Sequence, residues 1–343
     1  MLKNLFVYFT ALLFIGTLLM SCDQKNDAEI NVYSARKEAL IKPLFIEFEK
    51  QTGIKVNLVT GKADALIERL KSEGMNSPAD LIITSDAGRL FRAQEFNLTQ
   101  PVNSQILNDL IPKKLRDSEG HWFGLSLRAR PIMYAKDRIN PNQLSSYENL
   151  SHESWLNRIC IRSSSNIYNQ SLIASMIAST GEENVETWAK SFVNNFAREP
   201  VGGDRDQIKA VAAGQCDIAI ANTYYLFGML NSNDEAEKKA AEKIAIYWPN
   251  QDDRGVHVNI SGVALTKASK NQDNAIRLME YLVNEEAQKW YAEENGEYPV
   301  RANVAINSLI ASWGEFKQDD INLKELGLNN SKAVKLMDRA GWK

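Results

Sequence analysis

The chain has 343 residues, with 40 Lys and Arg against 43 Asp and Glu, three His and three Cys. This length suits two domains better than one, and a 44% hydrophobic share is that of a globular protein. The net charge of −3 lacks the basic excess of a nucleic-acid-binding protein, and three histidines leave little material for a His-built zinc or copper site.

The first 21 residues are predicted to be a lipoprotein signal peptide. One basic residue precedes the apolar run Leu5–Met20, which is shorter than the roughly 20 apolar residues of a transmembrane helix. The sequence Leu19-Met20-Ser21-Cys22 resembles a bacterial lipobox, in which Cys22 becomes the first mature residue and carries a lipid. Asp23 resembles the signal that keeps such lipoproteins in the inner membrane, and residues 22–28 are expected to form a flexible tether.

Strands and helices are predicted to alternate in the first third of the mature chain. Two helices are expected, one that begins or kinks at Pro43 and ends at Gly53, and one over Ala63–Glu73. Three apolar strands are expected before, between and after these helices along the chain: Ile30–Tyr33, Ile54–Val59 and Leu81–Ile83. Strands that alternate with helices predict βαβ units and a parallel sheet.

The same pattern restarts after a β-rich stretch at Trp122–Tyr134. The second block is predicted to hold two strands and two helices: Ile159–Arg162, Asp217–Ala221, Gln170–Thr180 and Ile208–Ala213. A second β-rich stretch, His257–Leu265, precedes a mainly helical end. Two α/β blocks joined by two extended stretches predict two lobes, with the ligand in the crevice at the strand ends between them.

Two cysteines remain in the mature chain, Cys160 and Cys216, each at the edge of a predicted strand. Export would place them in an oxidising compartment, where a disulfide can persist. The sequence does not give their separation, which must be within about 7 Å between Cα atoms for a disulfide. A disulfide and two buried free thiols are therefore both open.

Three tyrosines suggest a metal site. Tyr224 and Tyr225 follow the predicted strand Asp217–Ala221, and Tyr168 lies at a similar strand-to-helix junction whose Ser and Asn side chains can cap a helix. Fe(III) prefers oxygen anions and can displace the protons of phenols, whose ordinary pKa is about 10. Three phenolates balance the charge of Fe(III), and carbonate could bind to an arginine and a helix N-terminus. Packed aromatic residues are the alternative.

Six motifs occur in order along the mature chain: Asn31-Val32-Tyr33-Ser34-Ala35-Arg36, Ser77-Pro78-Ala79-Asp80, Leu125-Ser126-Leu127-Arg128-Ala129-Arg130, Ser164-Ser165-Asn166-Ile167-Tyr168-Asn169-Gln170, Asn222-Thr223-Tyr224-Tyr225 and Glu297-Tyr298-Pro299. In these motifs the chain resembles the periplasmic ferric-iron-binding proteins of bacterial ABC importers. The resemblance implies the type II solute-binding fold, an α/β fold of two lobes, each a mixed sheet flanked by helices, with an interlobe cleft. It also implies that Tyr168, Tyr224 and Tyr225 bind the iron.

The sequence departs from this family in its first lobe. Many relatives have a His ligand where this chain has Lys37 and Glu38, and others have a Glu where it has Ser85 beside Asp86. The first lobe therefore offers iron no usual ligand, and a role for Lys37 or Asp86 stays open.

The chain resembles the subgroup in which a bound anion or water completes the iron site. Arg36, Arg128 and Ser165 are the candidates for binding carbonate or another synergistic anion. For each arginine, a salt bridge is the alternative.

We therefore expect a receptor and not an enzyme. It would capture ferric iron and deliver it to the permease and ATPase of an ABC importer, as a periplasmic monomer held by its lipid on the inner membrane. The N-lobe would comprise residues 29–128 with about 256–303, and the C-lobe residues 129–255 with about 304–343. The alternative is a metal-free receptor for an oxyanion or small organic anion, in which Arg36 and Arg128 matter and the tyrosines form walls.

Overall fold

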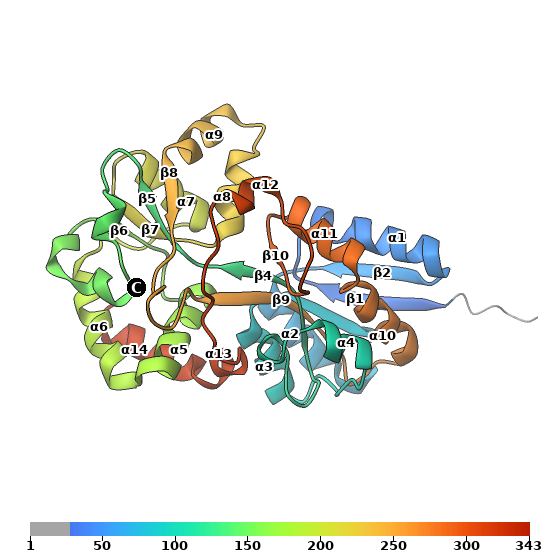
Figure 1. Cartoon of the computed structure of the whole chain (residues 1–343). Coiled ribbons are helices and arrows are strands. Elements are labelled where there is room, and N and C mark those ends of the chain that lie inside the picture. Colours follow the sequence, from blue (N-terminus) through green and yellow to red (C-terminus); the bar gives the residue numbers. More distant parts are fainter. Residues whose placement is uncertain (1–27) are drawn as a thin grey trace, which may run out of the picture.

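The computed structural model describes residues 28–343. The predicted signal peptide, Cys22 and nearly all of the predicted tether lie outside the described residues. Figure 1 shows two lobes, each built on its own sheet, with β4 and β9 running toward the region between them. Within residues 28–343, no helix has both the length and the apolar character needed to cross a membrane.

The N-lobe is built on a six-stranded sheet in the order β10-β4-β9-β3-β1-β2. Its strands are β1 (Glu29–Ser34), β2 (Lys55–Thr60), β3 (Leu81–Ser85), β4 (Phe123–Ala129), β9 (Val258–Leu265) and β10 (Tyr298–Pro299). Its helices are α1 (Lys42–Thr52), α2 (Ala63–Glu73), α3 (Ala87–Glu95), α4 (Gln105–Leu110), α10 (Gln272–Tyr281) and α11 (Glu285–Glu293). Strand β1 pairs in parallel with β2 and β3, whereas β9 is antiparallel to β3 and β4. The predicted parallel pairing of the first three strands is therefore confirmed, and β9, β4 and β10 complete the sheet in antiparallel pairs.

The C-lobe is built on a four-stranded sheet in the order β6-β7-β5-β8. Its strands are β5 (Ile132–Ala135), β6 (Ile159–Cys160), β7 (Ile218–Ile220) and β8 (Ile244–Tyr247). Its helices are α5 (Ile167–Thr180), α6 (Glu182–Asn194), α7 (Asp204–Ala212), α8 (Thr223–Leu230) and α9 (Glu235–Glu242). Only β6 and β7 pair in parallel, so both sheets are mixed, as the resemblance implied.

The end of the chain packs against both lobes. It contains three short helices: α12 (Ser308–Ala311), α13 (Lys324–Leu328) and α14 (Asn330–Arg339). Helix α13 packs against α3 of the N-lobe and α5 of the C-lobe. A Cβ atom at Gly327 would lie 2.3 Å from the Phe91 ring, so this close contact requires glycine. The residues at which each lobe begins and ends stay a prediction.

Short 3-10 turns complete the described loops: Glu38–Leu40, Gly74–Asn76, Lys113–Leu115, Pro141–Gln143, Glu148–Ser151 and Glu153–Trp155. Two helices of the C-lobe begin earlier than their apolar pattern predicts. Helix α5 begins at Ile167, where the Asn166 side chain accepts a hydrogen bond from the Tyr168 amide at 3.1 Å. Helix α7 begins at Asp204, after the Gly203 amide donates to the Asp206 carboxylate at 2.6 Å. Because these first turns are capped by polar groups, the apolar pattern starts too late to mark them.

Cys160 and Cys216 form a disulfide, with their Cα atoms 5.8 Å apart. Both side chains are buried in the core of the C-lobe, where Cys160 ends β6 and Cys216 precedes the neighbouring strand β7. Of the two possibilities that the sequence left open, the structure has the disulfide.

Candidate metal centre

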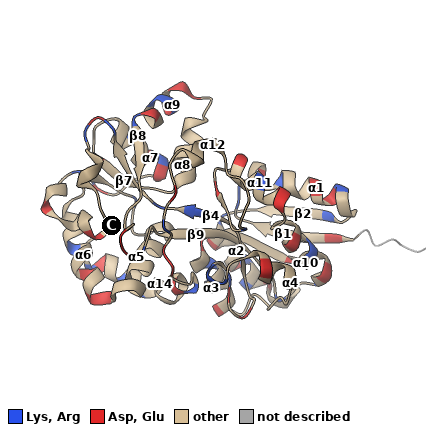
Figure 2. Ribbon diagram, in the orientation of Figure 1, with Lys and Arg blue, Asp and Glu red and all other residues tan. Residues whose placement is uncertain are grey.

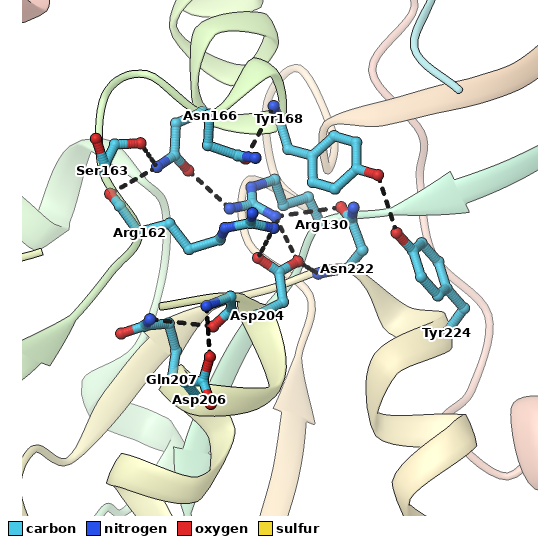
Figure 3. Close-up of polar contacts among 12 residues, drawn as sticks. Arg130, Arg162, Ser163, Asn166, Tyr168, Asp204, Asp206, Gln207, Asn222 and Tyr224 are labelled. Atoms are coloured by element: carbon cyan, nitrogen blue, oxygen red, sulfur yellow. Dashed lines mark hydrogen bonds and ion pairs between the residues drawn. The ribbon is translucent and has the colours of Figure 1, made fainter. Parts of the chain in front are cut away.

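The three predicted tyrosines lie together in the C-lobe. Tyr168 is in the first turn of α5, and Tyr224 and Tyr225 are in the first turn of α8. The Tyr224 hydroxyl donates to the Tyr168 hydroxyl at 3.3 Å, and Figure 3 shows these two groups facing each other. The centres of the Tyr224 and Tyr225 rings are 4.3 Å apart. The three tyrosine side chains therefore form one cluster.

The local topology explains this convergence. Helix α5 follows strand β6, and helix α8 follows β7, its parallel neighbour in the sheet. The carboxyl ends of neighbouring parallel strands meet at one edge of a sheet, so the helices that follow them begin side by side. Among the described residues, no group of three or more His, Cys, Asp or Glu could hold a metal ion.

Three guanidinium groups surround the Tyr168 ring. Their central carbons lie 5.2 Å (Arg128), 5.6 Å (Arg162) and 5.9 Å (Arg130) from the ring centre. Two of them share the fully buried carboxylate of Asp204, at 3.0 Å from Arg130 and 3.2 Å from Arg162. Figure 3 shows this network beside the tyrosines. One carboxylate against three guanidinium groups leaves the surroundings of Tyr168 positive.

Arg128 is the guanidinium of the three that makes no ion pair with a described carboxylate. It is 2% exposed, and its hydrogen bond to a protein group is to the Ser261 hydroxyl, at 3.4 Å from Nη1. Its Nε and Nη2 atoms have no partner among residues 28–343. Figure 2 shows the basic end of β4 between the two lobes. Because a buried charge without a counter-ion is costly, this group favours an anion beside it.

The same charges separate the pKa values of the three phenols. Burial raises the pKa of Tyr168, but the Arg128 charge and the Tyr224 hydroxyl outweigh burial and bring it below its ordinary value. Burial and a neighbouring Tyr168 phenolate hold the pKa of Tyr224 well above its ordinary value. The same two causes raise the pKa of Tyr225 to about 12. Tyr168 is therefore the first to ionise, and the other two need a strong cation.

Arg36 has a protein carboxylate as its partner. Its guanidinium makes two hydrogen bonds to Glu297, at 2.9 and 3.3 Å, and both side chains are buried. The Ser126 hydroxyl donates to the same carboxylate at 2.6 Å. The Arg36 Nε atom has no partner among the described residues. The structure therefore shows the salt bridge that was the alternative for Arg36.

Ser165 and Lys37 lie at exposed positions. The Ser165 hydroxyl shares a hydrogen bond with the Ser163 hydroxyl at 2.9 Å, in the turn before α5. Lys37 makes no ion pair with a described carboxylate, and no contact places it beside the tyrosines. Neither residue is brought to the phenol oxygens by any contact in the structure.

The Asp86 carboxylate faces away from solvent and joins the two lobes. It follows β3 of the N-lobe and accepts hydrogen bonds from the Ser171 hydroxyl of α5 at 2.8 and 2.9 Å. Asn259 of β9 and the Gly88 amide also donate to it, each at 2.9 Å. Burial raises the pKa of Asp86, although Arg128 opposes this change. Since Ser171 lies one turn after Tyr168, this contact fixes the tyrosine-bearing helix against the N-lobe.

Sequence reasoning missed Arg130, Arg162 and Asp204. Arg130 and Arg162 lie inside segments that were singled out for other residues, and Asp204 lies outside every element that the sequence analysis predicted. The polar cap that begins α7 could have placed Asp204 in a first helical turn, at the sheet edge that carries Tyr168 and Tyr224. Its pairing with two arginines has no signal in the sequence.

The fold and this cluster together define a two-lobed solute-binding protein, with its anionic donors where the lobes meet. Residues 76–319 match the family model described as "Bacterial extracellular solute-binding protein". The chain belongs to this family, whose members bind solutes for transport and are not enzymes.

The relatives agree with this assignment. "Iron uptake protein A1" of Synechocystis is 49% identical over 95% of this chain and 93% of its own. "Major ferric iron-binding protein" of Neisseria meningitidis is 25% identical over 92% of this chain and 94% of its own. A solved structure of a Trichodesmium protein (IdiA, FutA) with iron and citrate has a TM-score of 0.90 and 52% identity, over 92% of this chain and all of its own. A ferric-binding protein from Campylobacter jejuni has a TM-score of 0.87 and 40% identity, with the same coverage. The resemblance found in the sequence is confirmed.

Proposed function

We propose that this protein captures Fe(III) through the phenolates of Tyr168, Tyr224 and Tyr225. The observation that carries the proposal is the convergence of three phenols beside a buried arginine that has no carboxylate partner. Relatives whose names specify iron uptake or ferric iron, over more than nine tenths of the chain, support it.

The charges suit a hard trivalent cation with an additional anion. Three phenolates cancel the charge of Fe(III), and the Arg128 guanidinium then favours one more negative group. Carbonate or another synergistic anion fits this place. Since Arg36 is paired with Glu297 and Ser165 is exposed, Arg128 is the anion-binding candidate that the geometry supports best.

A metal-free receptor for an oxyanion or organic anion is the second reading. It would use Arg128 in the same way, but it gives no role to the close approach of the Tyr168 and Tyr224 oxygens. The names of the relatives favour iron.

The transport role follows from the family. We propose that the protein works in the periplasm as a monomer, anchored to the inner membrane through a lipid on Cys22, and delivers iron to the permease and ATPase of an ABC importer. The N-lobe would hold residues 29–128 and about 256–303, and the C-lobe the remainder.

A visible absorption titration tests the proposal. A soluble form that begins at Asp23 is titrated with a ferric chelate, and a phenolate-to-iron charge-transfer band should grow to one equivalent. Tyr168→Phe, Tyr224→Phe and Tyr225→Phe should each weaken the band and lower iron affinity while circular dichroism stays unchanged. Full ferric binding by all three variants would overturn the site, and a colourless protein stabilised by small anions would favour the oxyanion receptor.

A further inference from the structure

A recess of about 370 Å³ lies on the N-lobe between α1 and the α10–α11 pair. Pro43, Leu44 and Trp290 form apolar walls. The α5 and α8 tyrosines are not among its lining residues, so this recess is separate from the proposed iron site. We call it the α11 groove.

The rim of the α11 groove is acidic. Four carboxylates and one ammonium group line it: Glu47, Glu286, Glu293, Glu294 and Lys289. The Lys289 ammonium is already paired with Glu285 at 2.7 Å. Glu294 has no partner among the described residues, and Glu286 accepts only a long hydrogen bond, 3.4 Å, from Gln51. Glu47 is paired with Lys50 at 3.3 Å, so the negative charge that no described residue neutralises comes from Glu286, Glu293 and Glu294.

The groove also contains a buried polar group that has no partner. The Tyr281 side chain is 8% exposed and lines the recess, and its hydroxyl is buried without a hydrogen bond to any described residue. Its ring packs against Phe48, with the ring centres 5.4 Å apart. Buried hydroxyls are nearly always hydrogen-bonded, so the Tyr281 oxygen is able to accept a donor that enters the groove.

We propose that the α11 groove receives an arginine side chain from an extracytoplasmic loop of the permease. Arginine fits each observed feature: its stem packs on Pro43 and Leu44, its planar head stacks on Trp290, and its N–H groups reach the rim carboxylates. The Tyr281 oxygen can accept one further N–H. This inference rests on the proposed transport role, because that role requires a membrane partner.

The groove is connected to the proposed iron site through α11 and the turn that follows it. The Trp290 indole of α11 and the Asn295 amide of this turn both donate at 3.3 Å to the carbonyl of Leu40, in the 3-10 turn before α1. At Gly296, with φ of 63°, a Cβ atom would lie 2.3 Å from the ring of Phe227. Phe227 is in α8, three residues after Tyr224. A partner that binds α11 therefore lies next to the turn after α11, and this turn touches α8, the helix that carries Tyr224 and Tyr225.

The test compares two triple variants of the full-length protein. E286Q/E293Q/E294Q removes three charges from the groove, and the control E68Q/E95Q/E119Q removes three exposed charges elsewhere on the N-lobe. Binding to the cognate permease–ATPase complex in lipid nanodiscs is measured by biolayer interferometry, and ferric binding is measured in parallel by absorption. The groove variant should bind the complex at least tenfold more weakly, with iron affinity within twofold of wild type, whereas the control changes neither.

Tyr281→Phe is a second variant that removes only the hydroxyl. It should weaken docking several-fold while the melting temperature stays the same or rises, because that hydroxyl bonds to no described residue. If the groove triple variant binds the permease complex as tightly as the control does, the groove is not the docking site. This holds even where wild type binds iron normally. A wild type that docks through the groove but binds no Fe(III) would instead overturn the proposed cargo and leave the groove standing.

Discussion

Replacing Arg128 by methionine keeps an unbranched, flexible side chain in the same place, although a shorter one, and removes its charge. The guanidinium carbon is 5.2 Å from the centre of the Tyr168 ring, and we take this distance as the charge separation. With an effective dielectric constant of about 20, the attraction between the guanidinium and a Tyr168 phenolate is then about 3 kcal/mol. Because this attraction favours the phenolate, Arg128→Met should move the ionisation of Tyr168 to higher pH.

The assay is the near-ultraviolet absorbance of tyrosinate in the iron-free protein as a function of pH. Tyr168→Phe identifies the step that belongs to Tyr168, and Arg277→Met, at an exposed position, controls for loss of a positive charge. Ferric affinity should fall too, by less than the roughly hundredfold that 3 kcal/mol represents, since bound Fe(III) repels the same guanidinium. An unchanged tyrosinate step in Arg128→Met would refute the electrostatic role of Arg128.

Ferric affinity should decrease as pH falls, because phenols whose pKa lies well above neutral, such as Tyr225 at about 12, release protons when they bind iron. Each released proton changes the affinity about tenfold per pH unit, so competition titrations that give a flat profile would argue against phenolate ligands. Ser171→Ala removes the hydroxyl that donates to the buried Asp86 carboxylate, and the free energy of unfolding in urea should fall by about 1.5–3 kcal/mol. Ser175→Ala, which loses only a bond to a carbonyl, should cost less, and equal losses would contradict a charged interlobe bond. Replacing both Cys160 and Cys216, 56 positions apart, by alanine should lower the free energy of unfolding by about 2–4 kcal/mol, and denaturation curves that coincide with wild type would count against the disulfide as a stabilising link.

Local patterns in the sequence were sufficient for most elements of the fold. The helix over Ala63–Glu73 has the predicted bounds, and Gly53 ends the preceding helix with φ of 71°, as its position indicated. The pairing of the strands was harder to predict from the sequence, because β9 pairs with β3 although it lies more than 170 residues later in the chain. Nothing in an apolar strand tells the direction of a partner so distant in the chain.

The clustering of the three tyrosines was predictable from the sequence, whereas the charged groups around them were not. Each tyrosine lies in the first turn of a helix that follows a strand. Because the two strands are parallel neighbours, both helices begin at the same edge of the sheet. Arg36 and Arg128 looked alike in the sequence, and the difference between them is a single carboxylate, Glu297, which lies 261 positions after Arg36. Long-range pairs of this kind decide which charge is free, and an isolated sequence carries no record of them.

All three phenols belong to one lobe, and this has a consequence for unloading. When two rigid bodies swing apart, distances within each body do not change, so Tyr168, Tyr224 and Tyr225 keep their mutual arrangement. In the proposed iron site, lobe opening by itself would then break no bond between iron and oxygen, and would supply only access for solvent and competing chelators. Iron held in this way would leave when a chemical event weakens the bonds, through returning protons, departure of the proposed anion or reduction to the softer Fe(II). The rate of iron release should therefore depend on the supply of protons or electrons and not on how often the lobes open.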